Sequence, residues 1–324
     1  MKPTLTIVVP CYNEEEVLPE TTKRLGALLE KLVSQELTAP SSHVLYVDDG
    51  SKDRTWELIA AESSHNAQIR GLRLSRNRGH QTALLAGLQQ ATGDIVVSID
   101  ADLQDNPDVI IDMVGQFREG KDVVYGVRAA RTSDTFFKRF TAETYYKLLS
   151  ALGVELVFNH ADYRLLSRRA LDALLAYPEV NLFIRGIVPT LGFPTSTVEY
   201  DRTERFAGTS KYPLGKMLAL AVDGVTSFSS VPLRAISLAG IGIFIASCFL
   251  VVWVLWVRLV AGNAVPGWAS SVLPMYLLGG VQLFCIGVVG EYVAKTYMET
   301  KRRPRYFVRE TAEMASIRAE LKDQ

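Results

Sequence analysis

The first 130 residues repeat one pattern, in which a short β-rich run is followed by a polar loop and then by a helical apolar periodicity. Strands that alternate with helices in this way predict a mainly parallel sheet with right-handed crossovers, and therefore an α/β fold. Ligands of such sheets bind beyond the carboxyl ends of the strands. The expected strands are 5–9, 44–47, 69–74, 95–99 and 123–127, and the expected helices are 17–33, 55–62, 108–117 and one that ends at residue 91.

Polar loops follow the first four expected strands, so their side chains are expected to meet in one crevice. Any one of these loops also fits ordinary turn chemistry. The sequence lacks a Gly-x-Gly-x-x-Gly motif after the first strand and lacks a P-loop motif, which argues against both kinds of glycine-rich phosphate site. The loops in question are Tyr12-Asn13-Glu14, Asp48-Asp49, Arg76-Asn77 and Asp100-Ala101-Asp102.

The fourth expected strand ends on carboxylates. Its apolar run from Ile95 to Ile99 is typical of a strand that is buried on both faces. If the backbone continues extended, the side chains of Asp100, Asp102 and Gln104 point to the same side. Three hard oxygen ligands suit Mg²⁺ or Mn²⁺, which would hold a diphosphate. The alternative is that Asp100 and Asp102 only cap the following helix.

The composition indicates a folded chain with one soluble domain and a further part, because 324 residues exceed the usual domain length. The 35 basic and 35 acidic side chains cancel, so the total charge predicts no polyanionic partner such as nucleic acid. Three scattered cysteines do not form a disulfide framework or a zinc site. The N-terminus lacks the apolar core of a signal peptide, which predicts a cytosolic N-terminal part.

Two long stretches, 235–257 and 259–290, contain no Asp, Glu, Lys or Arg. Each is long enough for a membrane-spanning helix, which needs about 20 apolar residues. A turn near Asn263–Trp268 separates the first span from a second at about Ser271–Val289, so we expect a hairpin. The alternative is a buried helical pair in a soluble protein. Basic residues lie beyond both ends of the expected hairpin, so we expect both ends in the cytoplasm. They are Lys216, Arg234, Lys295, Lys301, Arg302, Arg303 and Arg305.

Between these parts, residues 134–152 combine aromatic side chains with Lys and Arg on a helical pattern. This is typical of an interfacial helix, although a core helix would also be amphipathic. Residues 214–228 predict a second helix with one apolar face. The tail after Arg309 is polar and predicts at most a loose helix.

Three motifs of the N-terminal half resemble the nucleotide-sugar domain of family 2 glycosyltransferases, which has the Rossmann-like GT-A fold. Further motifs resemble the polyprenyl-phosphate glycosyltransferases, which are related to dolichyl-phosphate mannosyltransferase. Among these, the bactoprenyl-phosphate glucosyltransferases of O-antigen (lipopolysaccharide) modification are the most similar. The motifs are Pro10-x-Tyr12-Asn13-Glu14, Val47-Asp-Asp-Gly-Ser51 and Asp100-Ala-Asp-Leu-Gln104, followed by Asn181-Leu-Phe, Gly208-Thr-Ser-Lys-Tyr212, Val231-Pro-Leu-Arg234, Gly290-Glu-Tyr292 and Arg303-Pro-Arg-Tyr306.

The resemblance implies four sets of site residues and four regions. Asp162 would lie near the reacting centre and, with Asp102, would be catalytic, whereas His160 is expected to be structural or exposed. The implied regions are a nucleotide-sugar-binding GT-A core at 1–130, an acceptor-side region with amphipathic juxtamembrane helices at 131–230, two transmembrane helices at 231–297 and a cytoplasmic basic tail at 298–324. The nucleotide sugar would contact Pro10, Tyr12, Glu14, Val47, Asp49, Asp100, Ala101 and Asp102; the metal would bind Asp100, Asp102 and Gln104; phosphate or acceptor would contact Arg128, Arg131, Arg205 and Lys211.

Arg128 and Arg131 also stand out from the residues alone, because cations beside a metal site stabilise phosphate. The alternative for this pair is a solvated surface position.

The resemblance implies metal-dependent transfer of a hexose, with inversion, from a nucleotide sugar to a polyprenyl phosphate such as undecaprenyl phosphate. UDP-glucose is the favoured donor. The acceptor phosphate is largely anionic near neutral pH and hardly needs a base, so Asp162 either deprotonates or orients. The enzyme would be a multi-pass protein of the inner membrane with its catalytic domain and both termini in the cytoplasm. A homo-oligomer and a flippase for the product are compatible with this role.

Two other functions share part of the pattern. A processive polysaccharide synthase has the first three motifs, but the sequence lacks Gln-x-x-Arg-Trp, and two spans are few for a translocation channel. A membrane-anchored protein that binds nucleotide sugars without turnover is the non-enzymatic alternative.

Overall fold

The computed structural model describes residues 2–128, 160–179, 184–201 and 268–314, together with scattered positions between 233 and 260. The chain divides into two compact units. The first unit comprises Met1–Tyr146, Glu155–Tyr212 and Arg303–Gln324, and the second comprises Lys147–Val154 and Pro213–Arg302.

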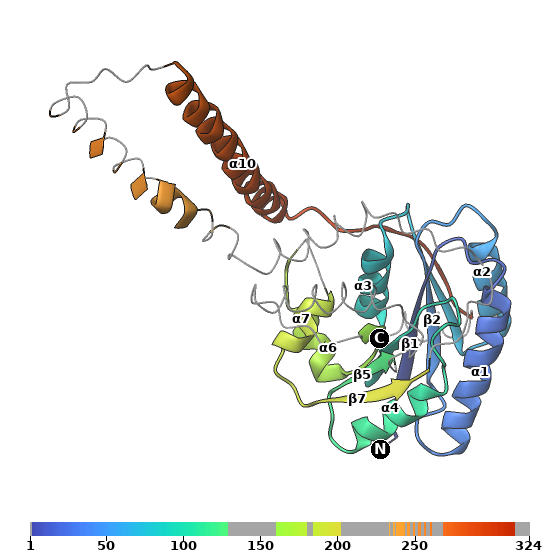
Figure 1. Ribbon diagram of the computed structural model, residues 1–324. Helices are drawn as coiled ribbons and strands as arrows, with labels where there is room; N and C mark the ends of the chain where they lie inside the picture. Colours follow the sequence, from blue (N-terminus) through green and yellow to red (C-terminus); the bar gives the residue numbers. More distant parts are fainter. Residues whose placement is uncertain are drawn as a thin grey trace. The chain divides into compact units, whose positions relative to one another are not determined.

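The first unit is built on an eight-stranded sheet with the order β7-β5-β6-β4-β1-β2-β3-β8 (Figure 1). The pairs β1–β2, β1–β4, β2–β3 and β5–β7 are parallel, whereas β6 runs antiparallel to β4 and β5, and β8 runs antiparallel to β3. The strands are β1 Leu5–Cys11, β2 His43–Asp48, β3 Ile69–Leu74, β4 Ile95–Ser98, β5 Val123–Arg128, β6 His160–Ser167, β7 Thr195–Tyr200 and β8 Val308–Ala312.

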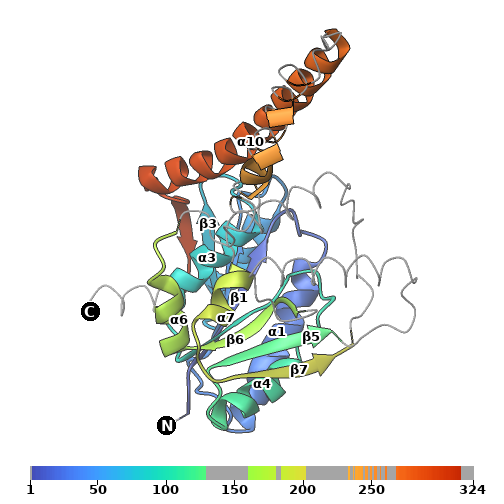
Figure 2. The same cartoon turned by 60° about the vertical axis from the view of Figure 1, so that its left-hand side comes forward.

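Helices cover both faces of this sheet, which is why the central strands are apolar throughout. Figures 1 and 2 show α3, α6 and α7 on the face opposite to α1 and α2. The helices of this unit are α1 Leu18–Ser34, α2 Thr55–His65, α3 His80–Gln90, α4 Val109–Arg118, α6 Arg168–Leu175 and α7 Ile184–Thr190.

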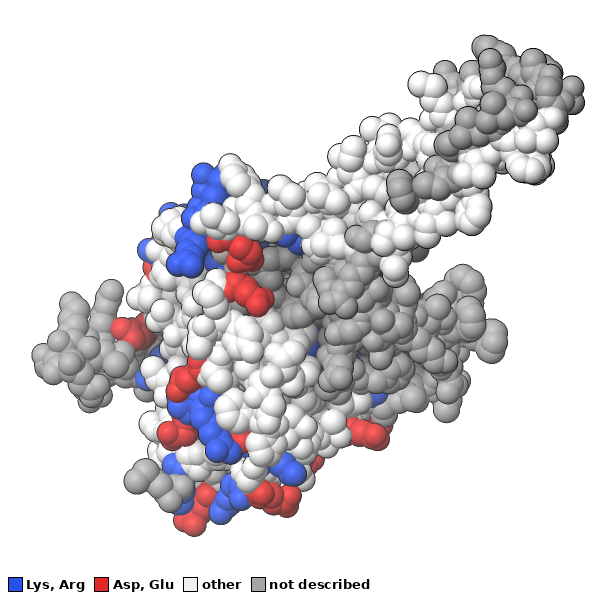
Figure 3. Space-filling model, turned by 90° about the vertical axis from the view of Figure 1, so that its left-hand side faces the viewer, with Lys and Arg blue, Asp and Glu red and all other residues white. Residues whose placement is uncertain are grey.

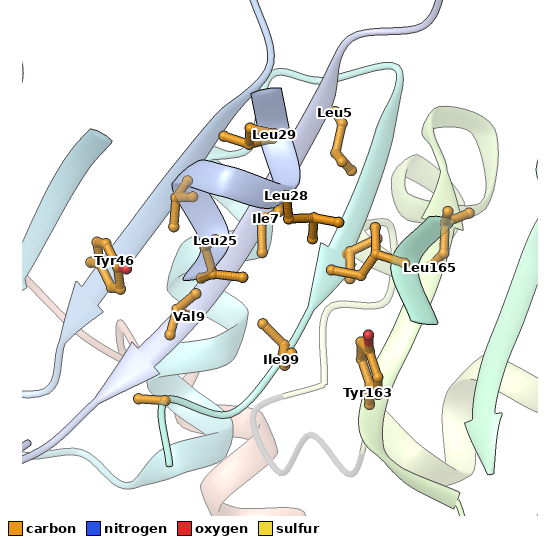
Figure 4. Packing of buried hydrophobic residues seen from close by; sticks show 14 of the residues in the cluster. Leu5, Ile7, Val9, Leu25, Leu28, Leu29, Tyr46, Ile99, Tyr163 and Leu165 are labelled. Carbon is orange, nitrogen blue, oxygen red and sulfur yellow. The ribbon is translucent and has the colours of Figure 1, made fainter. Parts of the chain in front are cut away.

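The core lies between the sheet and helices α1, α2 and α4. Leu25 and Leu29 of α1 pack with Ile7 and Val9 of β1 in one buried cluster (Figure 4). On the other face, α3 approaches β1 so closely that a Cβ atom on Gly87 would lie 2.3 Å from Val8 Cγ1. Only glycine fits at this position, so α3 and the loop before it are held against the carboxyl end of β1.

The predicted order of five strands and four helices is confirmed, and the sheet contains a further strand, β6, between two of the predicted ones. β6 inserts antiparallel between β4 and β5, with Ser98 opposite Arg164. Asp162 lies within β6, and α6 begins directly after this strand at Arg168. This strand was not predicted from the sequence.

The prediction of a loose helix after Arg309 is wrong for residues 310–312. Residues 308–312 form β8, which pairs with the edge strand β3. Leu72 lies opposite Thr311 and Arg73 opposite Glu310. A free edge strand presents unpaired backbone groups, and pairing with β8 satisfies those of β3. The last residues, 315–324, lie outside the described part.

In the second unit, α10 runs from Trp268 to Lys301. Its segment Leu278–Lys301 is long and apolar enough to cross a membrane and is not buried. Figure 3 shows no charged side chains along its apolar part. The described positions between 236 and 256 are also helical, with exposed apolar side chains such as Phe249 and Trp253. The described residues therefore contain one candidate span, longer than the predicted 271–289, and the hairpin stays a prediction. The predicted helices 134–152 and 214–228 lie outside the described residues.

His43 at the start of β2 predicts a pH-dependent stability. Burial, with a smaller effect of Arg70, lowers the pKa of His43 to about 4 from its usual 6.5. The unfolded chain therefore binds more protons below pH 6.5, and stability falls as the pH drops from 6.5 toward 4. At pH 5 the loss is about 2 kcal/mol.

Thermal unfolding of the full chain at pH 7 and pH 5 tests this expectation. His43→Asn keeps a nitrogen near Ser41 O, which His43 Nδ1 contacts at 3.2 Å, but removes the titration. The variant should lose less stability than the wild type between the two pH values. Equal losses in both proteins would contradict the prediction.

Candidate active site

A cavity of about 430 Å³ opens beyond the carboxyl ends of β1, β2 and β4. This is the position that the parallel arrangement of these strands predicts for a ligand. Its lining comes from six segments of the chain. The residues are Pro10, Cys11, Tyr12, Glu14, Asp49, Asn77, Gly79, His80, Ala83, Asp100, Ala101, Asp102, Asp162 and Arg185.

Most of the site residues expected from the sequence meet in this cavity. Val47 does not line it; the side chain is buried in β2 on the face that carries α3. Gln104 and Arg128 are also absent from the lining. Arg131, Arg205 and Lys211 lie outside the described residues. The predicted residues that line the cavity are Pro10, Tyr12, Glu14, Asp49, Asp100, Ala101, Asp102 and Asp162.

One side of the cavity is formed by the loop after β1 and by Asp49 at the end of β2. Asn13 adopts a left-handed backbone conformation with φ 56°, and its amide donates to Ser51 Oγ at 2.9 Å. Asp49 accepts from the backbone amides of Arg78 and Gly79 at 2.7 and 2.8 Å. Burial nevertheless raises the pKa of Asp49 against these hydrogen bonds. The contacts tie together the loops after β1, β2 and β3.

The prediction that the backbone continues extended from Asp100 to Gln104 is wrong. The chain turns at Ala101 and Asp102, and Leu103 has φ 56°. Asp102 Oδ1 accepts from the backbone amide of Gln104 at 3.2 Å. An aspartate that binds the amide two residues further on stabilises such a turn. The turn brings Asp100 and Asp102 to the cavity and leaves Gln104 buried beside it.

Asp100 is the carboxyl group whose environment most opposes its charge. Burial raises its pKa to about 6, and the nearby carboxylates of Asp162, Asp105 and Asp102 add to this effect, while His80 opposes it. A carboxyl group in such surroundings favours a cation nearby.

Asp162 lies across the cavity and is held by cationic and amide side chains. Arg185 binds it with both ends of its guanidinium, with Nε 3.0 Å from Oδ1 and Nη2 2.9 Å from Oδ2. Arg164 Nη2 lies 2.5 Å from Oδ1, Gln81 Nε2 donates to Oδ2 at 3.2 Å, and His80 Nε2 is 3.4 Å from Oδ2. Burial opposes ionisation of Asp162, but these partners outweigh it and hold its pKa well below the usual range. Asp162 is therefore a carboxylate at neutral pH.

His80 and Arg185 were not predicted from the sequence. His80 begins α3 directly after the loop that ends at Gly79, and its Nε2 lies 3.6 Å from Asp100 Oδ1. Arg185 lies in α7, and no local pattern marks it. The alternation of polar and apolar residues from His160 to Leu165 would have indicated β6. The position of the His80 side chain depends on how the loop that ends at Gly79 is folded, which the local sequence does not determine.

Arg128, an expected phosphate or acceptor contact, pairs with protein groups in this structure. Its Nη2 pairs with Asp105 Oδ1 at 3.3 Å, and its Nε donates to Tyr200 Oη at 3.4 Å. Burial lowers the pKa of Arg128, but the combined effect of Asp105 and Tyr200 is larger, so the pKa is raised. Arg128 therefore lies beside Asp105 at the end of β5, and its contact with phosphate stays a prediction.

The cavity carries more acidic than basic side chains. Five carboxylates line it, whereas its basic residues, His80 and Arg185, both contact Asp162. A ligand with a diphosphate would meet an unfavourable charge there unless a cation accompanied it. Among the described residues, no three His, Cys, Asp or Glu side chains form a complete metal cluster. Asp100 and Asp102 offer two carboxylates at the cavity, so a divalent ion held by them would need ligand and water oxygens at its remaining positions, as Mg²⁺ commonly has.

Comparisons with known proteins agree with this geometry. The model of "Glycosyl transferase family 2" matches residues 6–175. The uncharacterized glycosyltransferase YkoT of Bacillus subtilis (strain 168) is 50% identical over 309 residues, which cover 95% of this chain and 91% of that protein. The bactoprenol glucosyl transferase of Shigella phage SfX is 40% identical over 308 residues, which cover 94% and 98%.

Among solved structures, mannosyl-3-phosphoglycerate synthase from Rubrobacter xylanophilus is similar in fold, with a TM-score of 0.50 and 19% identity. The similarity covers 74% of this chain and 75% of that one.

Proposed function

The chain belongs to glycosyl transferase family 2, and from this membership we propose that it transfers a hexose from a nucleotide sugar to a polyprenyl phosphate. The favoured donor is UDP-glucose and the favoured acceptor is undecaprenyl phosphate. The observation that carries the proposal is the acidic cavity at the strand ends, where Asp49, Asp102 and Asp162 meet. The names of the relatives, which include bactoprenol glucosyl transferases at 38–40% identity, support the same acceptor class.

The nucleoside would lie on the side formed by Pro10, Tyr12, Glu14 and Asp49, and the diphosphate near Asp102. The cavity supports this placement because these side chains come from neighbouring loops that are hydrogen-bonded to one another. The sugar would then lie toward Asp162, on the opposite wall.

The reaction needs no strong base. A phosphate monoester has its second pKa near ~6, so the acceptor arrives largely as an anionic nucleophile. Asp162, whose pKa is held well below its usual range by its partners despite burial, is poorly suited to accept a proton. We assign it to positioning: it orients the sugar and fixes Arg185 and His80. Attack from the face opposite the diphosphate would invert the anomeric carbon.

Asp100 and Asp102 would hold Mg²⁺ or Mn²⁺ in this proposal. When bound, the ion neutralises the negative charge that develops on the leaving diphosphate. Gln104 would act indirectly, because its backbone amide fixes the Asp102 carboxylate. Arg128, Arg131, Arg205 and Lys211 stay proposed contacts of the acceptor phosphate.

We also propose that the enzyme works at the cytoplasmic face of the membrane. The apolar helix α10 supports membrane association, and basic residues at its end favour the cytoplasmic side. In this arrangement residues 1–130 bind the donor, 131–230 face the acceptor and 231–297 form a two-helix hairpin with both termini in the cytoplasm.

The central test is transfer by the purified protein. We expect UDP release from UDP-glucose to depend on undecaprenyl phosphate and on Mg²⁺ or Mn²⁺, with a product whose mass equals the lipid plus one hexose. A panel of nucleotide sugars, with UDP-glucose as reference, tests the donor. Release that ignores the lipid would contradict the acceptor assignment. A polymeric product would instead favour a processive synthase.

A further inference from the structure

Strand β8 follows the apolar helix α10 in the sequence and belongs to the first unit. It pairs with β3, and the backbone amide of Ser75, directly after β3, donates to Phe307 O at 2.9 Å. Ser75 begins the loop that supplies Asn77 and Gly79 to the cavity. Tyr306 Oη donates to Gln89 Oε1 in α3 at 2.6 Å. Residues just before and within β8 therefore contact segments adjoining the cavity.

The side chain of Glu310 in β8 contacts residues of α2 and β3. It accepts from Trp56 Nε1 at 2.8 Å and pairs with Arg73 Nη1 at 3.5 Å. Arg309 also pairs with this carboxylate, and its Nε lies 3.2 Å from Glu310 Oε1. The Arg73 guanidinium also lies over the Trp56 ring, 5.6 Å from its centroid. Three different elements, α2, β3 and β8, are thus joined at Glu310.

From Arg73 the contacts continue to the cavity. Arg73 Nε lies 3.3 Å from Oδ2 of Asp48, which is fully buried. Asp48 Oδ1 accepts from the Ser51 amide at 3.0 Å, and Ser51 Oγ accepts from the Asn13 amide at 2.9 Å. Asn13 is the left-handed residue between Tyr12 and Glu14, both of which line the cavity.

We propose that Glu310 and Arg73 are positioning residues for the nucleotide side of the cavity, acting through Asp48 and Ser51 on the Asn13 turn. The chemical reason is that Asp48 is buried beside Asp49, so its charge needs a partner, and Arg73 is the cation that pairs with it among the described contacts. Glu310 in turn fixes the Arg73 guanidinium. Without it, Arg73 is free to move toward solvent, and the Asp48 carboxylate loses its fixed orientation toward the Ser51 amide.

The functional consequence rests on the proposed use of UDP-glucose. Glu310→Gln keeps the shape and the Trp56 contact but removes the charge that holds Arg73. The Michaelis constant for UDP-glucose should rise about three- to tenfold, in the range seen for residues coupled to a site through intermediates. The constant for undecaprenyl phosphate and the maximal rate should change by less than about twofold.

Glu313→Gln is the matched control, because it removes the same charge from the same tail and lies near Arg70 instead of Arg73. Its constants should equal those of the wild type. Arg73→Gln should raise the UDP-glucose constant at least as much as Glu310→Gln, and the double variant should be no worse than Arg73→Gln alone. Additive effects, or equal effects of Glu310→Gln and Glu313→Gln, would overturn the proposal.

A second measurement does not need the reaction. Hydrogen–deuterium exchange of the full chain in detergent, without ligand, should show faster exchange of peptides that contain Asn13 and Ser51 in Glu310→Gln, and unchanged exchange in peptides that contain Asp162. If the wild type proves inactive with UDP-glucose, the proposed function fails while this test still decides the network. Unchanged exchange at Asn13 and Ser51 would overturn the positioning role.

Discussion

Asp162→Asn is expected to lower the maximal rate of sugar transfer by about a hundredfold or more, with the affinity for the nucleotide changed by less than about threefold. The carboxylate fixes Arg185 through two contacts of 3.0 and 2.9 Å and also contacts His80. Asparagine keeps the shape but cannot bind both ends of a guanidinium as a charged partner. Loss of this fixed geometry costs rate, because small displacements at a reacting centre have large effects.

The pH profile separates positioning from base catalysis. The wild-type rate should rise through about pH 6, where the acceptor phosphate loses its second proton. If Asp162 only positions, this acidic limb persists in Asp162→Asn at a lower rate. Loss of the limb would instead identify Asp162 as the base.

Two controls accompany this variant. Arg164 is almost fully buried beside Asp162, and leaving a buried charge unpaired costs about 3–5 kcal/mol. The unfolding midpoint must therefore be measured together with the rate. Asp172→Asn changes an exposed carboxylate on α6 that pairs only at the surface with Arg168 and should retain wild-type rates. Wild-type turnover of Asp162→Asn at saturating substrates would contradict both roles.

Asp102→Asn is expected to reduce transfer at least about a hundredfold and to weaken Mn²⁺ binding about tenfold or more. A divalent ion contributes several kcal/mol to stabilising a leaving diphosphate, and Asp102 offers one of two carboxylates of the turn that face the cavity. The variant also loses charge on the oxygen that accepts from the Gln104 amide. Titration of Mn²⁺ in the presence of UDP, followed by spin resonance, measures binding independently of turnover.

Asp108→Asn is the matched control for this experiment. Asp108 lies six residues further along the same loop, is exposed and pairs with Lys31 at 3.3 Å. Its removal should leave both metal binding and rate within about twofold of the wild type. Unchanged Mn²⁺ affinity and activity in Asp102→Asn would show that the turn does not hold the metal.

The sequence by itself determined the α/β class, the order of the first nine elements and four of the segments that meet at the cavity. These follow from local periodicity and from a general rule, because parallel strands present their carboxyl ends at one edge. Tyr12, Asp49 and Asp102 were therefore identified from the loops that carry them. The family motifs added Asp162, whose surroundings no local pattern describes.

Only the tertiary structure showed which side chains Asp162 contacts and which strand forms the edge of the sheet next to β3. β6 pairs with β4 across more than sixty residues of sequence, with Ser98 opposite Arg164, and this pairing brings Asp162 to His80 and Arg185. The contact of β8 with β3 joins residues still further apart, such as Leu72 and Thr311. Such pairings depend on which edge strands of the sheet remain unpaired after the central strands have assembled. The local sequence of a strand does not determine this. The turn at Asp102 also depends on a local hydrogen bond, which competes with the extended backbone that the residue spacing suggested.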